Sequence, residues 1–189
     1  MTSDEKLIIQ FISNIKHNKR LNILHIGIGN SYLYEKLKDR HAISGITISK
    51  QEISKSKMYK DKNYKVFYCD KFSKELNKIF NKSKFDLIVD NNLKSYSCCQ
   101  NSFDFMFKNL SNLLVANGSI LTSKRGMGWV KKIIPKISFN LKNFFHFKLK
   151  EIDGDLNNIF TISEAKELSV KNNLKLISKE KVTIFKKQK

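Results

Sequence analysis

Apolar and polar positions follow two periods along the first two thirds of the chain. Short apolar runs typical of strands occupy residues 21–26, 42–47, 64–68, 85–90 and 119–123. Segments with apolar residues at helical spacing lie before and between them, at 3–17, 30–39, 50–59, 72–80 and 101–115. Strands and helices that alternate with short turns predict a parallel, doubly wound α/β sheet with helices on both faces.

Two of these elements carry more specific expectations. The run "FDLIVD" at 85–90 is almost continuously apolar, which is typical of a strand buried on both faces. Ser3 is expected to cap the first helix, with Asp4 and Glu5 in its first turn.

The pattern changes in the last third of the chain. Residues 126–158 do not alternate regularly and hold several aromatic residues among lysines. A helix is expected at 161–173, followed by two strands within 174–187 that are joined tightly near 179–181. We therefore expect one domain over residues 1–189, in which 126–158 is a special segment.

Length and composition narrow the class of protein. A chain of 189 residues fits one domain with a sizeable core. No apolar run approaches the ~20 residues that span a bilayer, so no membrane insertion is expected. The first residues are polar and acidic, unlike a signal peptide, which favours a cytoplasmic location. The three cysteines are too few and too unevenly spaced for a disulfide framework or a zinc site. Cys98 and Cys99 are expected to be free thiols near the start of a helix, with a redox pair as the less favoured alternative.

The net charge of +19 raises nucleic acid as a partner. The charge is almost all lysine, however, because Arg20, Arg40 and Arg125 are the only arginines. Arginine is the residue best suited to bidentate hydrogen bonds with phosphates and base edges. A nucleic-acid substrate is therefore the less favoured alternative.

Gly27-Ile28-Gly29 follows the first strand directly and precedes a helix. Such a turn lets a ligand approach the backbone closely, although it also occurs as a plain strand-to-helix turn. A dinucleotide site would require a third glycine where Tyr32 stands, and an acid at the end of the second strand, where Thr47 stands. The dinucleotide interpretation is therefore poor.

Five motifs follow one another along the chain. They are "ILHIGIGNS" (23–31), "GITISKQE" (45–52), "FYCDKFS" (67–73), "KFDLIVDNN" (84–92) and the turn Asn117-Gly118 that leads into the fifth strand. Together they resemble the class I S-adenosylmethionine-dependent methyltransferases. The second motif is similar to that of the cyclopropane-fatty-acid-synthase-like and related small-molecule enzymes. The resemblance implies a Rossmann-like sheet of seven strands, mostly parallel, that ends in an antiparallel hairpin.

The same resemblance implies S-adenosylmethionine as cofactor and a role for particular residues. Gly27 and Gly29 would lie alongside the methionine half of the cofactor, and Asn30 and Ser31 would begin the next helix. The remaining cofactor-binding residues would be Thr47 and Ile48 beside the ribose and adenine, Glu52 for a ribose hydroxyl, Asp70 for the adenine amino group, Lys71 as a backbone donor, and Asp90 or Asn91 at the methyl-donor pocket.

Several of these positions have a plain structural alternative. Glu52 fits a solvated helix charge, and Asp70 fits a cap for the helix expected from residue 72. His25 stands where the family usually has an acid near the cofactor's ammonium group. A protonated imidazole would repel that group, so Asp90 is a candidate for its role, or His25 points into the core.

The acceptor site is expected in the irregular segment. Arg125, Gly126, Gly128 and Trp129 would form a lip over the acceptor, and the basic flank would suit an anionic one. His146 is the best candidate base, against the alternative of a surface histidine. No catalytic residue is assigned, because methyl transfer mostly requires positioning of the acceptor.

Three functional hypotheses follow from these residues and motifs. The first is a methyltransferase acting on a small molecule. The second is an S-adenosylmethionine-binding module without catalysis, suggested by His25. The third is an RNA methyltransferase, suggested by the net charge.

Overall fold

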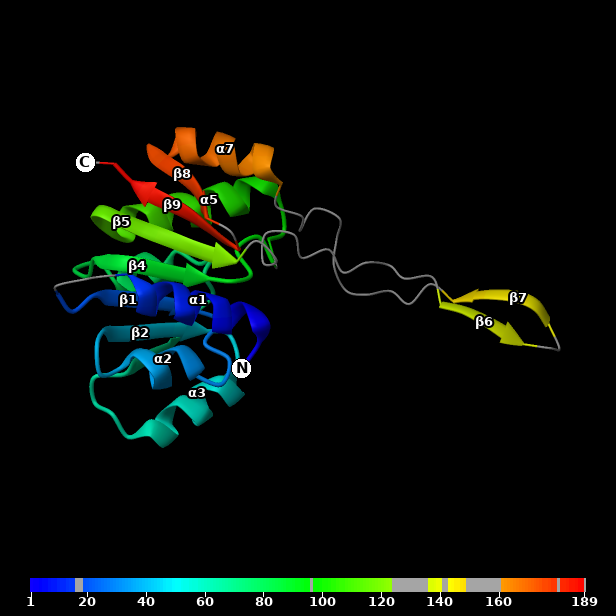
Figure 1. Cartoon of the computed structure of the whole chain (residues 1–189), viewed down its shortest axis with the longest axis horizontal. Helices are drawn as coiled ribbons and strands as arrows, with labels where there is room; N and C mark the ends of the chain where they lie inside the picture. The colour runs from blue at the N-terminus through cyan, green and yellow to red at the C-terminus, as the bar shows by residue number, and fades with distance from the viewer. Residues whose placement is uncertain are drawn as a thin grey trace.

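Seven strands form one mixed sheet in the order β3-β2-β1-β4-β5-β9-β8 (Figure 1). The computed structural model describes residues 1–15, 19–95, 97–123, 136–140, 143–148, 161–179 and 181–188. The strands of this sheet are β1 (Asn22–Ile26), β2 (Ala42–Thr47), β3 (Lys65–Tyr68), β4 (Phe85–Asp90), β5 (Leu114–Ser123), β8 (Leu174–Lys179) and β9 (Val182–Lys187).

The neighbours from β3 to β5 are all parallel, whereas β9 runs antiparallel to both β5 and β8. The predicted Rossmann-like sheet, mostly parallel with a C-terminal antiparallel hairpin, is therefore confirmed. The chain first builds β1, β2 and β3 outward and then returns to place β4 on the other side of β1. Ligands of such sheets bind beside this reversal, at the carboxyl ends of the strands.

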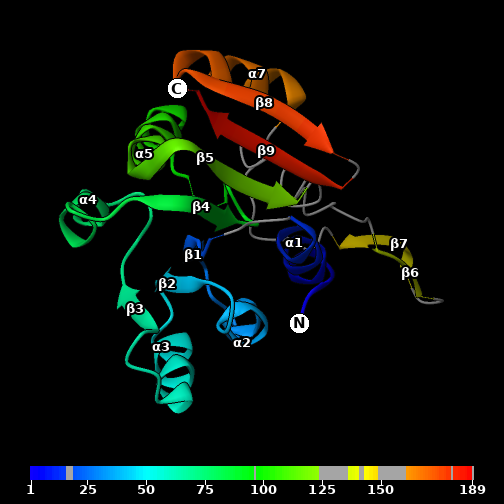
Figure 2. The ribbon, with the colours of Figure 1, turned by 60° about the vertical axis from the view of Figure 1, so that its left-hand side comes forward.

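Helices cover both faces of the sheet. They are α1 (Ser3–Asn14), α2 (Tyr32–Leu37), α3 (Lys50–Ser56), α4 (Glu75–Ile79), α5 (Gln100–Leu113) and α7 (Ile162–Lys171), and a 3₁₀ turn, η1 (Lys57–Tyr59), follows α3. Figure 2 shows α1 and α2 on one face and α4, α5 and α7 on the other. Each face has its own apolar core, because the buried residues divide into two clusters.

Strand β4 lies between these two cores. Phe85 and Ile88 belong to the cluster beneath α5, whereas Leu87 and Val89 belong to the cluster beneath α1 and α2. All four side chains are buried. The prediction of a strand buried on both faces is confirmed.

Helix α1 has its cap one residue earlier than the sequence predicted. The Thr2 hydroxyl accepts a hydrogen bond from Glu5 N at 3.2 Å, and the Glu5 carboxylate accepts one from Thr2 N at 2.8 Å. This reciprocal capping box makes Thr2 the cap and Ser3 the first helical residue, so the prediction of Ser3 as cap was wrong.

The irregular segment contains a second, two-stranded sheet. β6 (Lys136–Asn140) and β7 (Asn143–Lys148) pair antiparallel, which the sequence pattern did not predict. The rest of residues 126–158 lies outside the described part of the chain.

Candidate functional site

A cavity of about 610 Å³ opens at the carboxyl ends of β1, β2, β3 and β4. This volume lies within the range of small-molecule sites, roughly 300–1,000 Å³. The structure brings together on its wall all nine residues expected to bind the cofactor: Gly27, Gly29, Asn30, Thr47, Ile48, Glu52, Asp70, Lys71 and Asp90.

The glycine turn presents bare backbone to this cavity. Gly27 and Gly29 have φ angles of 68° and 54°, in the left-handed region that favours glycine. Gly27 N donates to Ile46 O at 2.9 Å, which ties the turn to β2. A Cβ atom added to Gly27 would meet no atom within 4 Å, so this face of the turn is open to a ligand.

Ser31 occupies the third glycine position of the motif and keeps the same backbone conformation, with a φ of 60°. Its side chain is buried, and its Oγ accepts a hydrogen bond from the Tyr64 hydroxyl at 2.9 Å. This bond compensates for part of the strain of a non-glycine residue in the left-handed region. The replacement therefore preserves the turn.

Gly45 is a residue of the site region whose role the sequence pattern did not reveal. A Cβ atom at this position would lie 2.5 Å from Ile28 Cγ2, closer than van der Waals contact permits. Ile28 is the middle residue of the glycine turn and is fully buried. The bare backbone of Gly45 in β2 thus lets Ile28 anchor the turn against the sheet.

Thr47 and Glu52 form the wall at the end of β2. Thr47 Oγ1 donates to Glu52 Oε2 at 2.6 Å and accepts from Ser49 N at 3.0 Å. Glu52 is therefore fixed at the cavity wall and is not a freely solvated helix charge. The adjacent Ile48 side chain is 54% exposed and offers an apolar surface at the cavity.

Asp70 closes a tight turn after β3. Its Oδ1 accepts a hydrogen bond from Phe72 N at 3.0 Å. Helix α4 begins only at Glu75, so the alternative that Asp70 caps a helix beginning at Phe72 was wrong. Asp70 instead shapes a local turn whose residues line the cavity.

Lys71 binds the end of β4 through its side chain, where the sequence suggested only a backbone donor to the cofactor. Its Nζ donates to Asp90 Oδ2 at 2.8 Å, to Asn92 O at 2.6 Å and to Leu93 O at 3.0 Å. Asp90 Oδ1 also accepts from Asn92 N at 2.9 Å. Asp90 is thus already neutralised inside the protein, which contradicts the hypothesis that it replaces the acid missing from β1.

His25 lies on β1 beside the glycine turn and lines the cavity. Only 2% of the residue is exposed, and burial lowers the pKa of its imidazole to about 4. The side chain is therefore neutral at pH 7, and the expected repulsion of an ammonium group does not arise. Its Nδ1 is buried without a hydrogen-bond partner among the described residues.

The first turn of α1 also lines the cavity, which the sequence pattern did not indicate. It contributes Asp4 and Glu5. With them, the wall holds five carboxylates: Asp4, Glu5, Glu52, Asp70 and Asp90. Lys71 is the one lysine or arginine among the described residues of the wall. In a chain of net charge +19, this acidic lining favours a cationic ligand.

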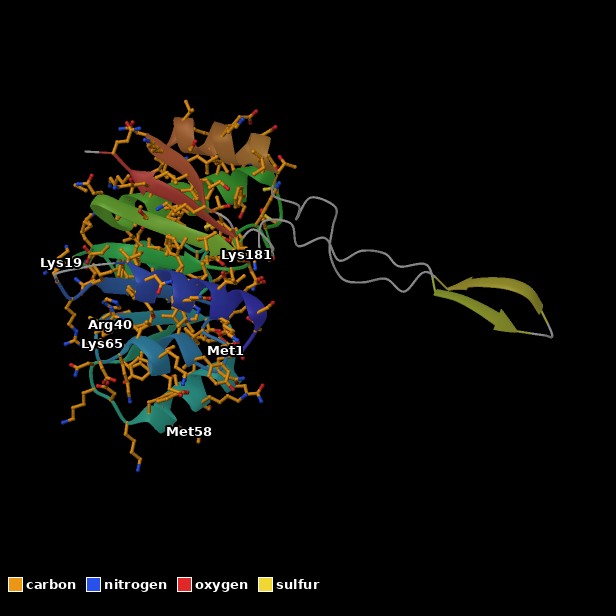
Figure 3. All side chains as sticks on the ribbon, viewed as in Figure 1. Met1, Lys19, Arg40, Met58, Lys65 and Lys181 are labelled. Carbon is orange, nitrogen blue, oxygen red and sulfur yellow. The ribbon has the colours of Figure 1, made fainter. Side chains whose placement is uncertain are left out.

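Three basic residues lie at the amino ends of the parallel strands, away from the cavity. Figure 3 shows Lys19, Arg40 and Lys65 on the left, whereas Met1, which lines the cavity, and Lys181 lie farther to the right. The positive charge of these residues is therefore separated from the acidic cavity.

The fold is shared with known methyltransferases. The N-methyltransferase NodS from Bradyrhizobium japonicum WM9 superposes with a TM-score of 0.61 at 12% identity, over 97% of this chain and 92% of that one. An S-adenosylmethionine-dependent methyltransferase from Clostridium acetobutylicum gives 0.65 at 13% identity, over 98% and 91%. This chain has the Rossmann-like methyltransferase fold. The amino pentose methyltransferase CalS10 from Micromonospora echinaspora gives a TM-score of 0.66 at 9% identity, over 97% and 90%.

These likenesses establish the methyltransferase fold and not a substrate. No protein-family model matches the sequence. No curated protein matches it significantly either.

None of the helices in the described part of the chain has the length and apolar character needed to cross a membrane.

Two asparagines of the cavity wall are held in place by hydrogen bonds. Asn30 Oδ1 accepts from Lys55 Nζ at 2.8 Å, and Asn91 Oδ1 accepts from Ser123 N at 3.3 Å. Arg125, Gly126, Gly128 and Trp129, with the side chain of His146, lie outside the described residues.

Proposed function

We propose that the protein is an S-adenosylmethionine-dependent methyltransferase that acts on a small molecule. One observation carries this proposal. The nine residues that motif resemblance selects from the sequence converge on a single acidic cavity, at the strand-order reversal of a methyltransferase fold. A pyrophosphate-bearing dinucleotide fits this lining poorly, because the carboxylates would repel it.

The residues present fit the cofactor. Its methionine half would pass over the open backbone of Gly27 and Gly29, where no Cβ atom intervenes. Glu52, fixed by Thr47, would accept a hydrogen bond from a ribose hydroxyl. Ile48 would pack on the adenine ring and Asp70 would accept from its amino group.

When bound, S-adenosylmethionine supplies a methyl group on a positively charged sulfur that a nucleophile displaces in line. The chain's contribution is to bind, orient and exclude water, and it needs a general base only for an acceptor that must lose a proton. The buried Lys71–Asp90 pair would keep the loops after β3 and β4 in one geometry around the reacting groups.

A small-molecule acceptor is supported by the nature of the structural relatives. They include the amino pentose methyltransferase CalS10 and the sugar N-methyltransferase KedS8. The "GITISKQE" motif supports placement near the cyclopropane-fatty-acid-synthase-like subgroup. We propose residues 126–158 as the segment that binds the acceptor. Arg125 and the lysines near it in the sequence favour an anionic acceptor.

Incorporation of a labelled methyl group tests the proposal. The purified chain is incubated with radiolabelled S-adenosylmethionine and, separately, with a metabolite extract and an RNA extract. Label is expected in the metabolite pool, and the labelled compound identifies the acceptor class. Label in RNA would favour the nucleic-acid alternative, and cofactor binding without any transfer would favour a non-catalytic module.

A further inference from the structure

Two buried polar atoms in the cavity residues have no hydrogen-bond partner among the residues that the structure describes. They are Asp4 Oδ1 on α1 and His25 Nδ1 on β1. Such atoms are rare in folded proteins, because each has given up a hydrogen bond to water without replacement. Both residues line the same cavity, so a ligand bound there is in a position to supply the missing partners.

The chemistry of the two atoms defines that group. An ionised carboxylate only accepts hydrogen bonds, and a neutral imidazole with its proton on Nε2 accepts at Nδ1. His25 is neutral at pH 7, because burial lowers its pKa. A group with several donor hydrogens and a positive charge satisfies both acceptors, and a primary ammonium has these properties.

Position within the cavity selects Asp4 among the carboxylates. Asp90 is paired with Lys71, and Glu52 is held by Thr47 at the end of β2. Glu5 accepts from Thr2 N in the capping box, and Asp70 accepts from Phe72 N. The first turn of α1 lies against the glycine turn, since Glu5 Oε1 is 3.6 Å from the Cβ position of Gly29. Asp4 therefore provides a carboxylate with one buried, unpartnered oxygen from the helix turn that covers the glycine turn.

We propose that Asp4 and His25 bind the α-ammonium group of the methionine half of S-adenosylmethionine, and that Asp4 supplies the negative charge that β1 lacks. This inference rests on the proposed function. The acid that similar enzymes carry on the first strand is here moved to α1. The histidine in its place serves as a neutral second acceptor.

Two ligands that differ only in the amino-acid portion test the proposal. S-adenosylhomocysteine contains the α-ammonium group, whereas 5′-methylthioadenosine has the same nucleoside and sulfur without it. Isothermal titration of the full chain and of Asp4→Asn with both ligands isolates the contribution of Asp4. Asp39→Asn is the matched control, because Asp39 is exposed and lies outside the cavity wall.

We expect Asp4→Asn to weaken binding of S-adenosylhomocysteine by about 10- to 100-fold, the range of one charge-assisted hydrogen bond. Affinity for 5′-methylthioadenosine should stay within about twofold, since it lacks the ammonium group. Asp39→Asn should leave both affinities unchanged. Asn fits the first turn of a helix, and a melting curve followed by circular dichroism verifies that α1 and the fold are intact.

Other outcomes distinguish a failure of the inference about Asp4 from a failure of the proposed function. If Asp4→Asn keeps its affinity for S-adenosylhomocysteine, or loses affinity for both ligands equally, the inference is overturned while the proposed function stands. If the unmodified chain binds neither ligand, the proposed function itself fails, and the inference fails with it.

Discussion

At the scale of single residues, the left-handed backbone of Gly27 makes the cavity accessible. Its φ of 68° suits glycine, and the missing Cβ leaves space on the side that faces the ligand. Gly27→Ala is expected to lower affinity for S-adenosylhomocysteine by about tenfold or more, because the methyl group enters that space. It should also cost roughly 1–2 kcal/mol of stability through backbone strain. Titration calorimetry and urea unfolding measure the two effects.

Asn173→Ala provides the control for backbone strain. Asn173 is exposed, has a φ of 53° and lies outside the cavity wall. This variant should lose stability without losing affinity. Unchanged affinity in Gly27→Ala would show that the ligand does not pass over the glycine turn.

His25 links stability to pH. Burial lowers its pKa to about 4 in the folded protein, whereas an unfolded histidine titrates near pH 6.5. The unfolded state therefore binds an additional proton between these values, so stability should fall as the pH drops from about 6.5 to about 4. The slope from this group is on the order of 1 kcal/mol per pH unit. Urea unfolding at several pH values between neutral and the folded-state pKa would measure it.

His25→Asn isolates this contribution. Asparagine does not titrate, so the variant should lose less stability than the unmodified protein over the same pH range. Identical slopes in the two proteins would mean that His25 is not held neutral in the folded state.

The limit of sequence reasoning at this scale is visible at Ser31. Its replacement of the third glycine can be read from the motif, but its consequence cannot. The hydroxyl that stabilises Ser31 belongs to Tyr64, and only the fold brings these residues together. The same holds for Asp4, whose burial against the cavity depends on how α1 packs across the sheet.

At the scale of elements, the contact between Ile28 and Gly45 joins the glycine turn to β2. Gly45→Ala would place a Cβ atom 2.5 Å from Ile28 Cγ2 and push the turn outward. We expect a loss of about 1–3 kcal/mol in stability, typical of overpacking, and weaker ligand binding. Chemical unfolding combined with titration calorimetry would detect both.

The double variant Gly45→Ala/Ile28→Ala checks this cause. Removing the Ile28 side chain beyond Cβ relieves the clash, so the double variant should lose less than the sum of the two single losses. Strictly additive losses would contradict a contact between the two side chains.

The Lys71–Asp90 pair joins the loops that follow β3 and β4. Both side chains are almost fully buried. Lys71→Met would leave the Asp90 carboxylate buried and unpaired, which should cost about 3–5 kcal/mol in urea unfolding. Lys19→Met is the control, because Lys19 pairs with Asp86 at 2.7 Å but has a side chain that is 69% exposed. Its loss should stay below about 1 kcal/mol, and equal losses would refute the special role of the buried pair.

The elements themselves were largely predictable, and their ends were not. β2 and β4 have the predicted bounds, since their apolar runs are bordered by polar residues. α4 starts three residues later than expected, because Asp70 directs its carboxylate to Phe72 N and closes a turn first. β5 begins at Leu114 and includes the Asn117-Gly118 pair as an irregularity, where the sequence indicated a turn.

At the scale of the whole molecule, charge is distributed unevenly. The chain carries +19 overall, and the cavity wall holds five carboxylates and one lysine among its described residues. Retention on heparin should therefore collapse at modest salt, because it depends on screened surface lysines. Affinity for S-adenosylhomocysteine should change far less between about 50 and 300 mM salt, since its ammonium and carboxylate groups cancel. Equal salt dependence of the two would place the ligand on the lysine surface and not in the cavity.

The parallel part of the sheet was predictable from the sequence because alternating strands and helices permit few topologies. The number of seven strands and the antiparallel end of the sheet came from the resemblance to the methyltransferases. In such a sheet, the carboxyl ends of the strands are where a ligand binds, and the cavity lies there. The antiparallel pair of β6 and β7 escaped prediction, since the phenylalanines and lysines around it follow neither period clearly.

Helix α1 serves two purposes at once. Ile8 and Ile12 pack into the core beneath it, while its first turn forms part of the cavity wall. Fraying of this turn would therefore remove a wall of the site, and an occupied site would in turn hold the helix down. Affinity and local unfolding become two measures of one linked equilibrium, so amides near the start of the chain would report on occupancy through their rate of exchange with solvent.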